Sequence, residues 1–314
     1  MIGELYDPRK EFGNAVTQAA KLNSDIVVFS ADSGKSSGFS QFAQLFPERY
    51  FECGIMEQGV VGMAAGMSTA GKIPVFCAIA PFATVRPYEM LRNDVGYMRQ
   101  NVKIVGRNCG ITYSDLGATH QSLDDLALMR MIPGMTVIAP QDPGEIRQAV
   151  YAMLKHKGPV YMRIGAPKNQ QIFEEVPFEI GKGKILREGD DVSIFSTGSA
   201  TADVLKAAEI LQEQNISVQL IGMPTVYPPD DELIRQSARK TRYVVTVEEH
   251  YVEGGLGSII CEVLCGEPNT IIHRMGLPKE YALTCSDYRR LLSYYQLDSD
   301  GIARNVLRFL GRNQ

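Results

Sequence analysis

Short apolar runs without polar alternation are the feature that most constrains the fold of this chain. They recur through the first half of the sequence, at 26–30, 73–79, 102–106, 135–139 and 160–164. A strand of this kind is buried on both faces, which is typical of a parallel sheet covered by helices. Segments of helical periodicity lie between the runs, at 88–99 and at 143–156, the latter with Asp142 as its N-cap. The pattern predicts an α/β fold.

A second set of α/β elements follows a stretch with little periodicity. Residues 166–190 mix proline, glycine and charge, which favours a linker. Beyond it, apolar runs and helical segments alternate again, with strands expected at 192–196, 218–222, 243–247 and 270–275 and helices at 200–214, 254–265, 285–295 and 299–312. We therefore expect two doubly wound domains, at 1–165 and 191–314, joined by the linker.

The composition excludes several classes of protein. With 45% hydrophobic and 22% charged residues in 314, the chain has the make-up of an ordinary globular protein. A net charge of −4 provides no basic face for nucleic acid and argues against binding to an anionic membrane. We find no membrane span and no export signal, so the cytoplasm is the expected compartment. The six cysteines form no CxxC pair and the histidines form no cluster, so no metal site is expected.

Glu57 is the first candidate for a functional side chain. It lies where a short apolar strand turns into a helix that is rich in glycine and alanine, from Gly59 to Ala70. An acidic residue at a helix start can simply complement the helix dipole. A helix with so little side-chain bulk, however, is expected to pack closely, and an acid at its buried start needs a partner for its charge or its proton.

Two further segments carry candidate chemistry. The segment 77–88 is a strand end that runs into a loop, and ligands of parallel sheets bind at the carboxyl ends of strands. Phe82 in it is either a core residue or a stacking platform for a flat ring. The segment 115–121 is a glycine-containing loop that ends at His120, a second site candidate. No GxxxxGK[ST] loop occurs, which excludes a P-loop nucleotide enzyme.

Taken in order, these segments resemble the transketolase family. The matching stretches are GIMEQGVVGMAAGMSTAGKIPVF, FATVRPYEMLRNDV, DLGATHQSLDDLALMRMIPGMTVIAPQDPGE, GPVYMRIG, VEEHYVEGGLGSIICEVL and HRMGLPKEY. They cover nearly the whole chain and correspond to the pyrimidine-binding (Pyr) domain and the C-terminal domain of the family. The diphosphate-binding domain, with its GDG…N metal motif, has no counterpart. The resemblance implies the C-terminal subunit of a split transketolase.

The resemblance implies a thiamine diphosphate site that is shared with a partner subunit, which would also hold Mg²⁺. Glu57 matches the glutamate that hydrogen-bonds a ring nitrogen of the aminopyrimidine and favours the imino tautomer, which takes the proton from the thiazolium carbon. Phe82 matches the residue that stacks on the pyrimidine. Asp32 and Tyr88 fall near the cofactor in the family, and Asp32 also falls near the subunit contact.

The substrate side of the site is likewise implied by the resemblance. His120 matches a catalytic histidine that contacts substrate oxygens, and Arg9 and Ser36 fall where the family contacts a sugar phosphate. Arg163 and Lys168 are further cations that could hold an anionic group.

Three positions depart from the family pattern. Leu116 stands where an acidic residue usually reads a sugar hydroxyl, Asn108 stands in place of a histidine, and Ala166 aligns with a phosphate-binding arginine. An apolar side chain cannot make the hydrogen bond to a hydroxyl. These changes predict a substrate unlike the common pentose phosphates.

Two alternatives remain open. The beta subunit of a 2-oxo-acid dehydrogenase has the same two domains and the same glutamate, although the GATHQ and IPGMTV segments favour transketolase. A non-catalytic scaffold subunit would keep the fold but would not need Glu57, Phe82 or His120. For the catalytic subunit we expect a heterotetramer with the partner and a possible homodimer of the isolated chain.

Overall fold

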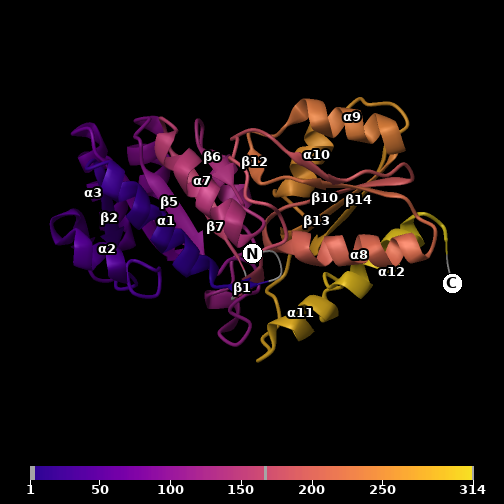
Figure 1. Ribbon diagram of the computed structural model, residues 1–314, viewed down its shortest axis with the longest axis horizontal. Helices are drawn as coiled ribbons and strands as arrows, with labels where there is room; N and C mark the ends of the chain where they lie inside the picture. The colour runs from indigo at the N-terminus through magenta and orange to yellow at the C-terminus, as the bar shows by residue number, and fades with distance from the viewer. Residues whose placement is uncertain (1–3, 166–167, 313–314) are drawn as a thin grey trace. The chain divides into compact units, whose positions relative to one another are not determined.

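The computed structural model describes residues 4–165 and 168–312 and divides the chain into two compact units. The first unit contains the described residues up to Cys109 together with Leu128–Ile180, and the second contains Gly110–Ala127 and the chain from Gly181 onward (Figure 1). The segment 110–127, which lies inside the predicted first domain, thus packs with the second unit. Ser114 in this segment accepts a backbone hydrogen bond from Cys285 at 2.7 Å.

A parallel sheet forms the centre of the first unit. Within this unit its strands run in the order β6-β7-β5-β4-β2-β3. Their bounds are β2 Ile26–Ser30, β3 Tyr50–Glu52, β4 Ile73–Ile79, β5 Lys103–Arg107, β6 Thr136–Ile138 and β7 Val160–Ile164. Every residue of β2, β5, β6 and β7 is buried, as expected for strands covered on both faces. All carboxyl ends of parallel strands lie at one edge, so the loops after β2, β4, β5 and β7 gather there.

Helices of the first unit pack on this sheet in two groups. The first group shares a hydrophobic core with strand residues such as Val28, Val75 and Val105, and consists of α1 Pro8–Leu22, α2 Ser40–Leu45 and α7 Pro143–Lys155. In the second group α3 packs against β4, against α5 and against a π-helical turn. This group contains α3 Glu57–Thr69, α4 Ala80–Ala83, α5 Tyr88–Met90 and the turn Leu91–Tyr97. The short strands β1 Leu5–Tyr6 and β8 Asn169–Gln170 pair antiparallel.

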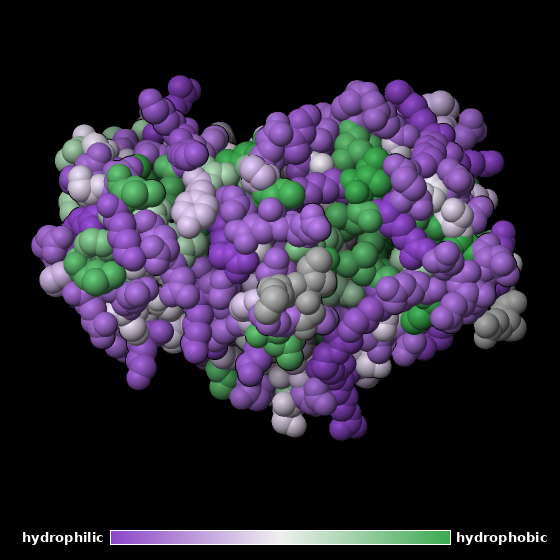
Figure 2. Space-filling view, viewed as in Figure 1, coloured by the Kyte–Doolittle hydropathy of each residue, from purple (hydrophilic) through white to green (hydrophobic). Residues whose placement is uncertain are grey.

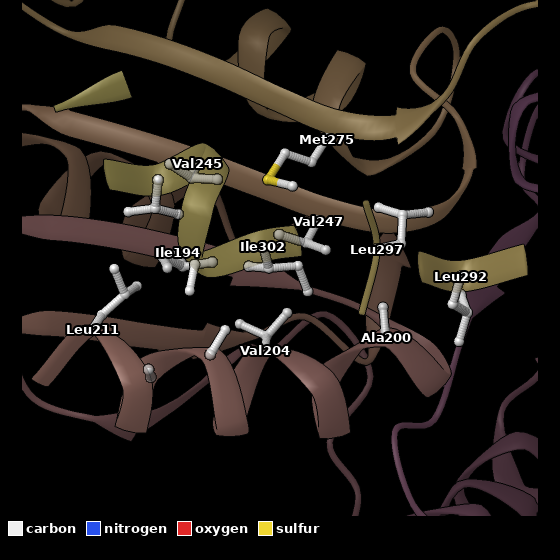
Figure 3. Packing of buried hydrophobic residues seen from close by; sticks show 14 of the residues in the cluster. Ile194, Ala200, Val204, Leu211, Val245, Val247, Met275, Leu292, Leu297 and Ile302 are labelled. Atoms are coloured by element: carbon white, nitrogen blue, oxygen red, sulfur yellow. The ribbon is translucent and has the colours of Figure 1, made fainter. Parts of the chain in front are cut away.

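The second unit has its own sheet, in the order β14-β13-β10-β11-β9. Its strands are β9 Lys184–Arg187, β10 Val192–Ser196, β11 Val218–Gly222, β13 Tyr243–Tyr251 and β14 Ile271–Leu277, and only β9 pairs antiparallel. The core lies between this sheet and two helices, where Ile194, Val245 and Val247 meet Val204 and Ile302 (Figure 3). The remaining elements are α6 Asp125–Arg130, β12 Thr225–Tyr227, α8 Thr201–Glu213, α9 Asp231–Thr241, α10 Leu256–Val263, α11 Tyr288–Tyr294 and α12 Ser299–Phe309.

The predicted fold class, two α/β domains with predominantly parallel sheets, is confirmed. Several details differ from the sequence pattern. The predicted helix 88–99 is a short α5 that continues as a π-helical turn to Tyr97. The strand expected to end at Val247 continues to Tyr251, which places consecutive polar residues inside the sheet. Helices α1 and α9 were not identified from the sequence, and strands β8 and β9 lie within the predicted linker.

Among residues 4–165 and 168–312, every helix is too short or too polar to cross a bilayer. Figure 2 shows hydrophilic residues over most of the face in view, with separate hydrophobic patches between them.

Candidate functional site

Side chains from several strand ends of the first unit make up the candidate site. Glu57 follows β3 and Phe82 follows β4, while Asn108 comes directly after β5 and Asp32 lies two residues after the end of β2. Arg163 is one residue from the end of β7. This is the edge of a parallel sheet at which ligands bind in doubly wound folds.

Glu57, Arg86 and Phe82 form one connected cluster. Glu57 is the first residue of α3 and is 3% exposed. Its Oε1 accepts a hydrogen bond from the Arg86 guanidinium at 2.5 Å. The same guanidinium lies over the Phe82 ring, 3.9 Å from its centroid. A flat cation therefore stacks on an aromatic face while it donates to a buried carboxylate.

The sequence pattern predicted part of this cluster. Glu57 does lie in the first turn of its helix and does have a partner for its charge, as expected. The signal for Arg86 was weak, because nothing in the pattern says where the side chain four residues after Phe82 points. In α3 itself, the apolar residues Val60, Val61 and Ala64 are buried.

The small residues of α3 differ in their surroundings, since Ala64 and Ala65 are buried and the glycines are not. A side chain at Gly66 would meet no atom within 4 Å, and one at Gly62 would approach only an oxygen of Asp94. One face of α3 is therefore open.

Tyr88 has a structural contact in this unit. Its hydroxyl donates to the backbone carbonyl of Leu128 at 3.0 Å, and the residue is half-buried at the start of α5. This bond ties the segment that carries Phe82 and Arg86 to α6.

Asp32 lies at a depression of about 560 Å³ beside the end of β2. The depression is lined by Asp32, Ser33, Gly34, Lys35, Ser36, Tyr50 and Glu52. Asp32 is exposed and has a left-handed backbone with φ of 53°. Its backbone N–H donates to Glu52 at 2.7 Å. Burial opposes ionisation of Glu52, but the backbone N–H of Asp32 and the other hydrogen bonds outweigh it and lower the pKa of that carboxyl.

Arg107 joins two of the predicted substrate residues and was missed by sequence reasoning. It ends β5 and is almost fully buried. Its guanidinium donates to Ser36 Oγ at 2.7 Å, to Ser37 Oγ at 3.1 Å and to Asn108 Oδ1 at 2.9 Å. Ser36 and Asn108, 72 positions apart, are thus connected through one cation. The available signal was an arginine directly at the end of a buried strand, which is unusual for so polar a residue.

The other cations predicted for an anionic substrate differ in burial and in their local partners. Arg9, in the first turn of α1, pairs with Asp7 at 2.8 Å, and Arg163 is buried in β7. Lys168 is exposed, and Ala166 lies outside the described residues.

His120 and Leu116 belong to the second unit. They flank a short 3-10 helix, Gly117–Thr119. The His120 ring nitrogen Nδ1 lies 2.9 Å from Thr119 Oγ1, and its ring meets Tyr113 edge-on at 5.8 Å. Leu116 is 49% exposed, so its side chain is available to a ligand.

A buried carboxylate anchors the start of the loop that carries His120. Glu249 Oε1 accepts from the backbone N–H of Ile111 at 2.8 Å, and Oε2 accepts from Ser199 at 3.1 Å and from Tyr288 at 2.7 Å. Burial, and then the charge of Glu249, raise the pKa of Tyr288 well above its usual value. The hydroxyl therefore stays protonated and donates. Sequence reasoning missed this network because its members come from four separate segments.

No group of three or more histidine, cysteine or acidic side chains in the described ranges is arranged to hold a metal ion.

Comparison with known proteins identifies two domain families. Residues 6–169 match the family described as transketolase, pyrimidine binding domain. Residues 181–302 match the family described as transketolase, C-terminal domain.

Several relatives match over their full length. A protein of Methanocaldococcus jannaschii named putative transketolase C-terminal section is 40% identical over 311 residues, which cover 98% of this chain and 97% of that protein. A protein of Phocaeicola vulgatus, named as one of the subunits of an apulose-4-phosphate transketolase, is 34% identical over 312 residues, with 99% of each chain covered. A solved structure described as split gene transketolase, inactive beta4 tetramer, superposes with a TM-score of 0.88 at 38% identity and covers 98% of this chain and 99% of that one.

Proposed function

The chain belongs to the transketolase family, and we propose that it is the C-terminal half of a two-subunit enzyme that transfers ketol units with thiamine diphosphate. One full-length relative is named as a C-terminal section and another as a separate transketolase subunit, which confirms the predicted resemblance to the C-terminal subunit of a split transketolase. The activity, the cofactor and the partner are the proposal.

The observation that carries the proposal is the Glu57–Arg86–Phe82 cluster. An aminopyrimidine needs a flat apolar face and a carboxylate at its edge, and the cluster offers both to a flat nitrogen-containing group. The flat guanidinium of Arg86 makes the contacts with Phe82 and Glu57 that the N–C–N edge of such a ring would make. The residues present therefore fit the pyrimidine part of the cofactor.

In this proposal Glu57 is the proton-sharing acid of the pyrimidine pocket, and Phe82 is its floor. Burial of Glu57 keeps water away from its carboxyl group, so a proton placed between it and a ring nitrogen is held there. When bound, the cofactor supplies the carbon nucleophile that accepts the ketol unit. His120 contacts substrate oxygens, Asp32 lies near the cofactor, and Tyr88 holds the segment that carries Phe82.

On the substrate side we propose an anion-binding role for Arg9, Ser36, Arg163 and Lys168. Arg107 adds to this set, since it already donates to Ser36. Asn108 and Leu116 replace residues that read common pentose phosphates in the family. The relative from Phocaeicola vulgatus is named for apulose 4-phosphate. That name agrees with a substrate that differs from the common pentose phosphates.

The partner is proposed to be a chain that carries GDG…N, binds Mg²⁺ and closes the cofactor site from the other side. Large apolar side chains are exposed next to Glu57 in the sequence (Ile55 and Met56), on α3 (Met63) and next to Arg86 (Val85). Together with the open face of α3 at Gly66, they are suited to be covered by another chain. Two such pairs would form a heterotetramer, and the isolated chain would be a homo-oligomer.

Reconstitution tests this proposal. The chain and a partner of the GDG…N type are purified separately and mixed, and ketol transfer from a ketose to an aldehyde acceptor is measured with thiamine diphosphate and Mg²⁺. We expect activity only in the mixture and without a lipoyl acceptor. Tight Mg²⁺-dependent cofactor binding by the isolated chain would contradict the split site, and activity restricted to 2-oxo acids with a lipoyl acceptor would identify the dehydrogenase subunit instead.

Leu116 provides the test of the substrate class. We expect poor use of xylulose 5-phosphate and ribose 5-phosphate by the unmodified pair, because an apolar side chain cannot pair with their hydroxyl group. Leu116→Asp should raise kcat/KM for these sugars by about tenfold relative to the native substrate, the equivalent of one hydrogen bond. Efficient use of pentose phosphates by the unmodified pair would show that this position does not set specificity.

A further inference from the structure

Arg86 and the pyrimidine ring of the proposed cofactor compete for the same two contacts. We propose that Arg86 is a built-in occupant of the pyrimidine pocket, which fills it in the cofactor-free chain and must leave before the cofactor binds. This inference rests on the proposed function, since it takes the Glu57–Phe82 pocket as the pyrimidine site. It assigns to Arg86 a role that the family resemblance did not supply.

The geometry makes the two occupants mutually exclusive. The guanidinium carbon lies 3.9 Å from the centroid of the Phe82 ring, which is the separation of two stacked flat groups. No second ring can enter that space. The Arg86 Nη1 donor also occupies Oε1 of Glu57 at 2.5 Å. A pyrimidine that stacks on Phe82 and pairs with Glu57 therefore displaces the guanidinium from both contacts.

The occupant is needed because Glu57 is buried. A carboxylate that is 3% exposed and unpaired would be strongly unfavourable, so a chain without cofactor needs a cation beside it. Arg86 provides that cation, and its planar shape lets it lie flat on Phe82, as a lysine could not.

Arg86 is also free to leave. Its side chain is 34% exposed, whereas that of Glu57 is 4% exposed, so the guanidinium reaches solvent at one edge. It lies between α4 and α5, outside both helices. Among the described residues, the Arg86 side chain contacts Glu57 through a hydrogen bond and Phe82 through stacking. The pocket can therefore open by rotation of one side chain.

Binding of the pyrimidine half alone tests the inference. The probe is the uncharged hydroxymethyl aminopyrimidine that forms one half of thiamine, and its dissociation constant for the full chain is measured by calorimetry. Arg86→Ala should bind the probe about tenfold more tightly, as expected when a competing state populated about nine-tenths of the time is removed. Arg86→Lys, which keeps the charge but not the flat shape, should lie between the two.

A matched control and a salt series separate competition from a change of net charge. Arg92→Ala removes an exposed arginine on the neighbouring π-helical turn and should leave the dissociation constant unchanged. Raising the salt concentration weakens the Arg86–Glu57 pair, so the unmodified chain should bind the uncharged probe more tightly. Arg86→Ala should show no such salt dependence.

The outcomes are distinct. If Arg86→Ala binds the probe no better than the unmodified chain, while Phe82→Ala and Glu57→Gln lose binding, the competition is refuted and the proposed function stands. If the isolated chain binds too weakly to measure, the same comparison in the complex with the partner decides. If no form binds the probe in either state, the pocket is not a pyrimidine site, and both the inference and the proposed function are overturned.

Discussion

Glu57 and Glu249 are both buried carboxylates, yet the two units surround them differently. Glu249 is 2% exposed and receives hydrogen bonds from Ile111, Ser199 and Tyr288. Glu57 is 3% exposed, and in the described residues its recorded side-chain partner is the half-exposed Arg86. A carboxylate whose oxygens accept hydrogen bonds from several segments holds those segments together and has a structural role. One that is held by a single movable cation has capacity left for a ligand.

This difference shows which property separates a binding site from a structural hydrogen-bond network. The two carboxylates are buried to the same extent, so burial alone does not tell a functional acid from a structural one. The number of donors and their freedom to move separate the two, because only the Glu57 contact can be exchanged without breaking the fold. Substitutions of these two carboxylates, of a buried lysine and of an exposed aspartate test this distinction.

Glu57→Gln is expected to give the largest effect. In the reconstituted pair, turnover should fall by about 10²–10⁴-fold, the range typical of a positioned acid–base group, because an amide cannot exchange the proton. The free energy of unfolding should change little, since the amide still fills the position. Steady-state kinetics and urea unfolding measure the two quantities. Normal turnover of the variant would show that Glu57 is not the functional carboxylate of the two.

Glu249→Gln should show the opposite profile. Loss of the charged acceptor for Tyr288, Ser199 and Ile111 should lower the free energy of unfolding by about 2–3 kcal/mol. Urea unfolding followed by circular dichroism measures this. If the variant keeps full stability but loses turnover in the reconstituted pair, Glu249 is itself part of the site and the comparison fails.

Lys103 sharpens the comparison with a buried cation at the amino end of β5. Its Nζ donates to Asn101, His156 and Gly158 at 2.7 Å each. Burial lowers its pKa from 10.5 to about 7. The unfolded chain therefore binds the additional proton between these values, and the free energy of unfolding should rise with pH there.

Between pH 7 and pH 9 the expected rise from Lys103 is about 2 kcal/mol. Urea unfolding of the chain and of Lys103→Met across this range measures it, and the variant should lose that part of the pH dependence. An identical pH dependence in both proteins would show that Lys103 titrates at its usual value in the fold.

Asp25→Asn is expected to give the smallest effect. Asp25 pairs with Lys72 at 2.9 Å, but both side chains are exposed. Such pairs contribute about 0.5 kcal/mol or less, because water already solvates the charges. Urea unfolding should show a change within that limit. If Asp25→Asn lowered the free energy of unfolding as much as Glu249→Gln does, burial would not determine how much each charged group contributes to stability.

The amino-acid sequence by itself determined the architecture. Runs such as 26–30 and 192–196 are mostly apolar and lack charged residues, and the strands occur at those residues. Asp142 also caps α7, where its side chain accepts from Glu145 N. These features depend on neighbours in sequence, and a local pattern records them. Together with the motif around Glu57, they were sufficient to indicate the family.

Tertiary structure alone decided which side chains meet. The contact between Glu57 and Arg86 joins residues 29 positions apart, and Arg107 reaches Ser36 across 71 positions. The loop with His120 follows a strand of the first unit in sequence, yet it packs with the second because Glu249 receives the N–H of Ile111. Such contacts are set by the path of the backbone and by the need to pair each buried charge, and neither is encoded in the spacing of one segment.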